Sequence, residues 1–101
     1  MPDRTKLTPE AIRRELAGLP GWRVEGDKLL RSYRFESFAR AFAFMAGAAV
    51  DAQALNHHPD WSNVYDRVEI TLWTHDRDGV TALDVELAQR MEKLAARLGE
   101  A

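Results

Sequence analysis

All imidazole side chains of this chain fall within one short stretch. His57 and His58 are adjacent in the segment Asn56-His57-His58-Pro59-Asp60-Trp61, and His75 follows after one strand-like run. Histidine is the residue whose unperturbed pKa lies near neutrality, so it serves in proton transfer, in metal binding and in pH sensing. The spacing marks this stretch as a place for chemistry and leaves the three uses open.

Each chemical use competes with an ordinary structural role. A histidine pair at the end of a helix can cap the last carbonyl groups, and a lone histidine in a turn is usually solvated. Zinc accepts three imidazoles and a water in catalytic sites, but adjacent residues rarely point at one ion, and no His-x-x-x-His pair is present. Convergence of His75 with the pair at one end of a sheet favours an acid/base site.

Capping residues, glycines and prolines predict how the first third of the chain is divided. Residues 1–7 are predicted to form a loose leader, and Thr8-Pro9-Glu10 begins a helix that ends near residues 18–21. Residues 22–25 and the stretch after Gly26-Asp27 alternate between apolar and polar side chains. This alternation predicts an antiparallel pair of strands.

The period of the apolar residues then changes to that of a helix, which should run from Ser37 to about Leu55. Its stripe at i, i+4, i+7 and i+11 consists of Phe38, Phe42, Met45 and Ala49. Other apolar or small residues in the same helix are Phe44, Ala46, Gly47, Ala48 and Ala52. A helix that is apolar on more than its core face usually has a second partner, so we expect oligomerisation through this helix.

The histidine pair should sit where the central helix ends. Pro59 disfavours helical geometry at His58, so the helix must stop before it. Two further strands are expected with a turn at Asp66-Arg67, and the second carries Val68, Ile70 and Leu72 on one face. Continuing that alternation puts His75 on the side away from the core.

A last helix is predicted to begin just beyond the turn that carries His75. Thr81 can cap it, and Asp84 stands three residues later, which is a typical capping arrangement. Asp84 can therefore serve the helix and the site together. The complete order predicts an α+β fold, α-β-β-α-β-β-α, with a four-stranded antiparallel sheet and three helices packed on one face.

Composition limits the classes of function. The chain has 101 residues, which predicts one domain with its core over about residues 8–98. Fourteen basic and sixteen acidic residues give a net charge of -2 without a block of either sign, which argues against nucleic-acid binding. Cysteine is absent, and we find no signal peptide and no apolar run of about 20 residues. We therefore expect a cytoplasmic protein with no membrane segment and no thiolate site.

The chain resembles a known family over roughly residues 8–98. The resemblance is carried by residues 56–65, by Thr71-Leu72-Trp73-Thr74-His75 and by Asp84, and it extends upstream through residues 35–38 and 41–45. The family is that of the pterin-4a-carbinolamine dehydratases, also known as dimerisation cofactors of a hepatocyte nuclear factor. Together these motifs are highly specific, whereas any one of them alone is weak.

The resemblance implies a dimer or a dimer of dimers, with the helix over about 37–55 at an interface. It implies dehydration of 4a-hydroxytetrahydropterin to quinonoid dihydropterin, which recycles the cofactor of aromatic amino-acid hydroxylases. No metal and no organic cofactor is required, and a hydroxylase is an implied partner. By carry-over, the acid/base candidates are His57 and His75, and the substrate-binding candidates are His58, Pro59, Trp61 and Asp84. Which histidine is the acid stays open.

One position departs from the family pattern. Family members commonly have a glutamate four residues before the first histidine, whereas this chain has Gln53. Glutamine keeps the length and the hydrogen bonding but loses the charge, so activity or substrate preference could differ. This departure keeps a second hypothesis open, in which the chain is a binding module that assembles with or regulates a hydroxylase or a transcription factor.

Overall fold

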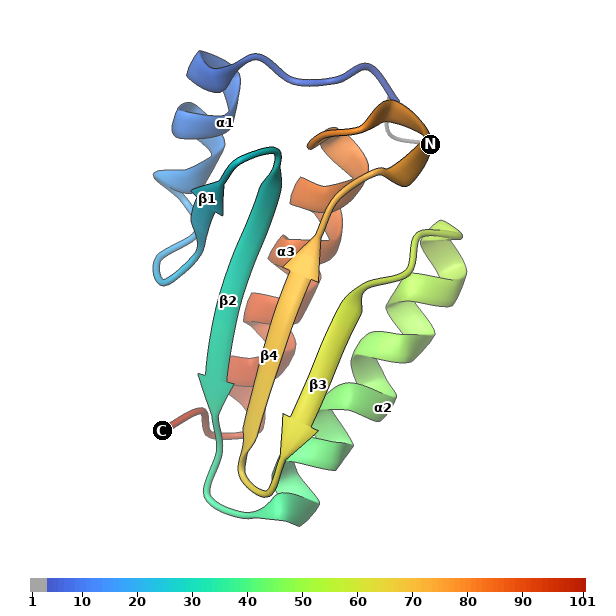
Figure 1. Cartoon of the computed structure of the whole chain (residues 1–101). Helices are drawn as coiled ribbons and strands as arrows, with labels where there is room; N and C mark the ends of the chain where they lie inside the picture. Colours follow the sequence, from blue (N-terminus) through green and yellow to red (C-terminus); the bar gives the residue numbers. More distant parts are fainter. Residues whose placement is uncertain (1–3) are drawn as a thin grey trace.

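The computed structural model describes residues 4–101, and the predicted α+β order is confirmed (Figure 1). The elements are α1 (Pro9–Leu16), β1 (Arg23–Glu25), β2 (Lys28–Arg34), α2 (Phe38–Leu55), β3 (Asp60–Val64), β4 (Arg67–Leu72), the 3-10 turn η1 (His75–Arg77) and α3 (Ala82–Arg97). The strands form one antiparallel sheet in the order β1-β2-β4-β3. Helices α2 and α3 run along one face of it, and α1 joins the same core through Ile12.

The register of the sheet decides which side chains face the helices. Val68, Ile70 and Leu72 of β4 are buried against them, as predicted. Trp61 is paired with Ile70 and therefore faces the helices, whereas its neighbour Asp60 faces the opposite side. The β3–β4 turn lies at Tyr65-Asp66, one residue before the predicted position, because Tyr65 adopts a left-handed φ of 52°.

Of the stripe that periodicity picked out on α2, only Met45 packs against the core. The residues that are buried are Ala41, Phe44, Ala48, Ala52 and Leu55. Phe38 and Phe42 are 49% and 57% exposed and pack on each other with ring centroids 5.9 Å apart. Both faces of the helix are apolar, so spacing alone cannot choose between them. The alanine-rich face is the one that packs inside the domain.

A partly buried carboxylate, Glu92, fastens the first hairpin to α3. Trp22 Nε1, Arg31 Nε and the Tyr33 hydroxyl all donate to Glu92 Oε1, at 2.8, 3.1 and 2.5 Å. Burial raises the pKa of the Tyr33 phenol far above its usual value, and the bond to Glu92 acts in the same direction. Tyr33 therefore remains a donor at every physiological pH.

Residues 1–7 were predicted to form a loose leader, and the part of it that the structure describes is hydrogen-bonded to the rest of the domain. Residues 1–3 lie outside the described part of the chain, but residues 4–7 are fastened although they form no helix or strand. The Leu7 amide donates to Val80 O at 2.8 Å, and Arg77 Nε donates to Arg4 O at 3.0 Å. These bonds join positions far apart in the sequence, which local patterns do not reveal. Across residues 4–101, no helix is both long and apolar enough to cross a membrane.

Candidate active site

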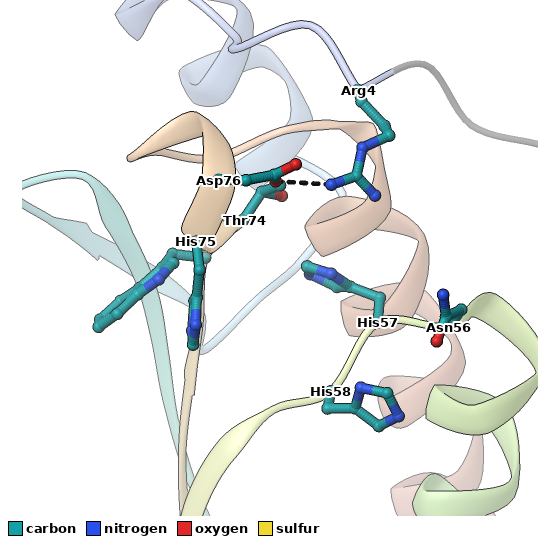
Figure 2. A pocket seen from close by; sticks show the side chains of 8 residues that line it. Arg4, Asn56, His57, His58, Thr74, His75 and Asp76 are labelled. Carbon is teal, nitrogen blue, oxygen red and sulfur yellow. Dashed lines mark hydrogen bonds and ion pairs between the residues drawn. The ribbon is translucent and has the colours of Figure 1, made fainter.

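A pocket of about 280 Å³ opens where the exits of α2 and β4 meet the N-terminal segment (Figure 2). Its volume lies near the lower limit of the roughly 300–1,000 Å³ that small-molecule sites occupy. Its lining consists of Arg4, Asn56, His57, His58, Trp73, Thr74, His75 and Asp76. The predicted convergence of all three histidines at one end of the sheet is therefore present.

His57 is held in place by the way α2 ends. Asn56 takes a left-handed conformation with φ 50°, and the His57 amide donates to Ala52 O at 3.0 Å. This turns the chain so that the imidazole enters the domain, where the side chain is only 8% exposed. Its Nε2 lies 2.5 Å from Asp84 Oδ1.

Asp84 is fully buried at the start of α3 and lies behind the imidazole of His57. Its Oδ2 accepts from the Thr81 amide and from the Thr74 hydroxyl, both at 2.9 Å. Since the Thr74 proton is used in that bond, the Thr81 hydroxyl donates to Thr74 Oγ1 across 2.7 Å. Thr81 also accepts from the Leu83 amide, which completes the predicted cap of α3.

This network fixes the tautomer of His57. A carboxylate accepts hydrogen bonds and cannot donate them, so Nε2 of His57 carries the proton of its bond to Asp84. Nδ1 is then the ring nitrogen available for proton transfer. Among the described residues, no buried side-chain nitrogen or oxygen lacks a hydrogen-bond partner. The site is therefore preorganised on the His57 side.

His75 approaches the pocket from the opposite side (Figure 2). It begins η1 and is exposed, while Thr74 before it is buried, which confirms that His75 faces away from the core. Its Nε2 lies 3.7 Å from Asp60 Oδ2, and its ring centroid lies 4.6 Å from that of Trp73. Lys28 Nζ covers the Trp73 ring at 3.5 Å. His75 is thus positioned by packing at an open edge.

The other predicted site residues either turn away from the pocket or do not line it. The ring of His58 turns toward α2, where Nε2 lies 3.3 Å from Gln53 Oε1 (Figure 2). Pro59 and Trp61 are not among the residues that line the pocket, and Trp61 packs against the core. Asp84 does not line the pocket and reaches it through its bonds to His57 and Thr74.

Sequence reasoning did not select several lining residues. Trp73 was named only as part of a family motif and not as a site residue, and Arg4 fell in the expected leader. The alternation along β4 signals that Thr74 points inward, so that residue could have been found. Asp76 directly follows His75 in η1, but no local pattern brings Arg4 to this end of the sheet, because its contact with Asp76 spans 72 positions in the sequence.

The three-histidine zinc site is not supported by the geometry. Within residues 4–101, no group of three or more His, Cys, Asp or Glu side chains is placed to hold a metal ion. His57 directs Nε2 at Asp84, and His58 turns toward Gln53. The remaining arrangement is a buried imidazole–carboxylate pair facing an exposed imidazole, which suits transfer of protons.

Fold and pocket together define a small α+β domain with a histidine-lined pocket at one end of its sheet. The sequence profile of the family described as pterin 4 alpha carbinolamine dehydratase matches residues 5–94. The chain belongs to this family.

Individual relatives agree with the family match. A provisionally named pterin-4-alpha-carbinolamine dehydratase of Rhizobium rhizogenes is 53% identical over 94 residues, which cover 91% of this chain and 93% of the relative. One of the same name from Opitutus terrae is 55% identical over 92 residues, or 90% and 95% of the two chains. The crystal structure of a transcriptional coactivator/pterin dehydratase from Brucella melitensis superposes with a TM-score of 0.88 at 44% identity, covering 90% of this chain and 99% of that one.

Proposed function

We propose that this protein dehydrates a 4a-hydroxytetrahydropterin to quinonoid dihydropterin and water by histidine acid/base catalysis. The observation that supports this best is the buried His57–Asp84 pair facing His75 across the pocket. The bond from C4a to the hydroxyl oxygen breaks, and an acid delivers a proton to that oxygen. The lone pair of N5 forms the C4a=N5 double bond while a base takes the N5 proton, so atoms and charge balance.

Two imidazoles on opposite sides of the substrate can supply this acid and this base. His57 offers Nδ1, and His75 is open to solvent and can exchange protons with it. Either assignment of acid and base satisfies the proton balance. Asp84 holds the ring of His57, and His58, Pro59 and Trp61 are proposed to bind the pterin or to shape the region beneath it. No metal or organic cofactor enters this mechanism.

The test of this function is turnover by the purified chain with the carbinolamine as substrate. We expect the rate of quinonoid dihydropterin formation to exceed the uncatalysed rate when the protein concentration is far below that of the substrate. A chain that leaves the uncatalysed rate unchanged would contradict the proposal. We further propose that the reaction recycles the cofactor of an aromatic amino-acid hydroxylase in the cytoplasm, since a chain without cysteine suits a reducing compartment.

Gln53→Glu is expected to change turnover by less than about threefold. Gln53 is exposed, lies outside the pocket lining, and contacts the site only through a long bond to His58. An exposed charge interacts weakly with its neighbours because water screens it. Steady-state kinetics of the two proteins measure the effect. A gain of tenfold or more would instead show that the native chain is a compromised enzyme.

The alternative function is that of a binding module that regulates or assembles with a hydroxylase or a transcription factor. The exposed rings of Phe38 and Phe42 favour it, together with an apolar hollow that they form with Ala39 and Ala43. The Brucella protein is titled a transcriptional coactivator as well as a pterin dehydratase. The turnover assay separates a catalyst from a module that only binds.

We expect the same apolar face of α2 to join copies of this chain into a dimer or tetramer. Light scattering should give a mass of two or four chains, and Phe42→Glu should lower it because a charge in an apolar interface is costly. Val24→Glu, at an exposed position of β1, is the matched control and should leave the mass unchanged. A monomer at high concentration would contradict the expectation.

A further inference from the structure

The N-terminal segment carries a cation to the rim of the pocket. The Arg4 carbonyl accepts from Arg77, and the Leu7 amide is bonded to Val80, so the backbone of residues 4–7 is fixed across the η1 turn. Figure 2 shows the Arg4 side chain extending from this segment toward Asp76, above the histidines. Among the described lining residues, Arg4 is the only Lys or Arg.

Arg4 and Asp76 form a close pair, with Nη2 2.5 Å from Oδ1. The hydrogen bond from Arg4 holds the pKa of Asp76 below its usual range, so this carboxylate is charged at neutral pH. Both side chains are about half exposed, at 44% and 58%. Asp76 Oδ2 also accepts a long bond of 3.4 Å from Arg77 Nη1. A guanidinium has five N–H donors and each carboxylate oxygen has two lone pairs, so these bonds leave capacity on both Arg4 and Asp76. The pair presents a donor beside an acceptor at the pocket.

We propose that the Arg4–Asp76 pair binds the lactam edge of the pterin ring, with N3–H donating to Asp76 and the C4 carbonyl oxygen accepting from Arg4. This inference rests on the proposed function, since it takes a pterin as the ligand. A lactam places a donor and an acceptor side by side, which is the complement of what the pair offers. C4 is bonded directly to C4a, so holding the carbonyl at this rim places the reacting carbon on the side of the imidazoles.

The proposal predicts discrimination between two ligands of the same shape. A 2,4-diaminopteridine replaces the C4 carbonyl with an amino group and leaves N3 without a proton. Arg4 would then face a donor and Asp76 would face a lone pair, so both contacts become unfavourable. A site whose polar groups are left unpaired rejects such an analogue.

Calorimetric titration at pH 7 with pterin and with 2,4-diaminopteridine tests this on the full chain. We expect the native protein to bind pterin about tenfold more tightly, a factor limited by the exposure of the pair. Arg4→Met and Asp76→Ala should each reduce the preference to less than about twofold. The matched control is Arg23→Met, because Arg23 is also exposed and paired with a carboxylate, Glu25, but lies outside the pocket. It should retain the native preference.

Equal binding of the two ligands by the native protein, no binding of either, or unchanged preference in both variants would overturn the inference. Turnover measured in parallel separates it from the proposed function. If the native protein prefers pterin over 2,4-diaminopteridine but does not turn over the carbinolamine, the dehydratase function is wrong and the lactam contact stands. If it turns over the carbinolamine but binds both ligands equally, the lactam contact is wrong and the dehydratase function stands. In an active enzyme, Arg4→Met should raise KM more than it lowers kcat, because the pair binds the ring and does not transfer its protons.

Discussion

Replacing His57 by glutamine is expected to lower kcat by about 10²–10⁴-fold while the chain stays folded. A well-placed acid or base typically contributes a factor of this size. The glutamine amide can still donate to Asp84, so the buried carboxylate keeps a partner, but it offers no nitrogen that exchanges protons near neutrality. Single-turnover kinetics with the carbinolamine measure the loss, and circular dichroism verifies the fold.

His75→Gln should have a comparable effect on kcat, because the reaction needs a proton donor and a proton acceptor at once. The matched comparison is His58→Gln, which should cost less, since the ring of His58 turns toward Gln53. Near-native rates in both His57→Gln and His75→Gln would refute the acid/base mechanism. If only one variant retains its rate, solvent water replaces that histidine, and the exposed His75 is the one open to such replacement.

Asp84→Asn is expected to lower kcat by about 10²-fold or more and to lower the free energy of unfolding by about 1–3 kcal/mol. The carboxylate accepts from His57, Thr74 and Thr81, and an amide would turn its NH₂ group toward at least one of these donors. The His57 ring then loses the bond that fixes its tautomer. Urea unfolding and steady-state kinetics measure the two losses separately.

Asp51→Asn is the control for the Asp84 variant. Asp51 is a partly exposed aspartate of α2 whose partner is Arg90, outside the pocket. We expect its replacement to change neither kcat nor the free energy of unfolding appreciably, because partly exposed ion pairs contribute little.

KM should be nearly native in Asp84→Asn, since Asp84 lies behind His57 and outside the lining. A native kcat in this variant would show that Asp84 serves only to cap α3.

The elements of the fold could be predicted because their signals are local. The central helix begins next to Ser37 and ends before the histidine pair, as predicted, and Thr81 caps α3. The alternation along β4 correctly placed His75 away from the core. These signals come from neighbours within a few residues, so one sequence contains them completely.

Two features of the structure could not be predicted in this way. Periodicity picked out the stripe of α2 that carries Phe38 and Phe42, which are exposed. Both faces of this helix are apolar, and only the rest of the domain decides which one is buried. The rim formed by Arg4 and Asp76 depends on a contact between the two ends of the chain. The family resemblance did not supply it either, since the quoted motifs begin at residue 35.

Asp84 caps α3 and also holds His57, and these two roles together limit which residues can replace it. A helix cap alone tolerates several residues at its third position, and glutamate or glutamine is common there. Here the same side chain must reach back to the Thr81 amide and sideways to an imidazole, so its length is fixed by two partners in different elements. Substitutions that keep α3 well started can still misplace His57. Position 84 is therefore expected to change more slowly during evolution than its role as a cap alone would require.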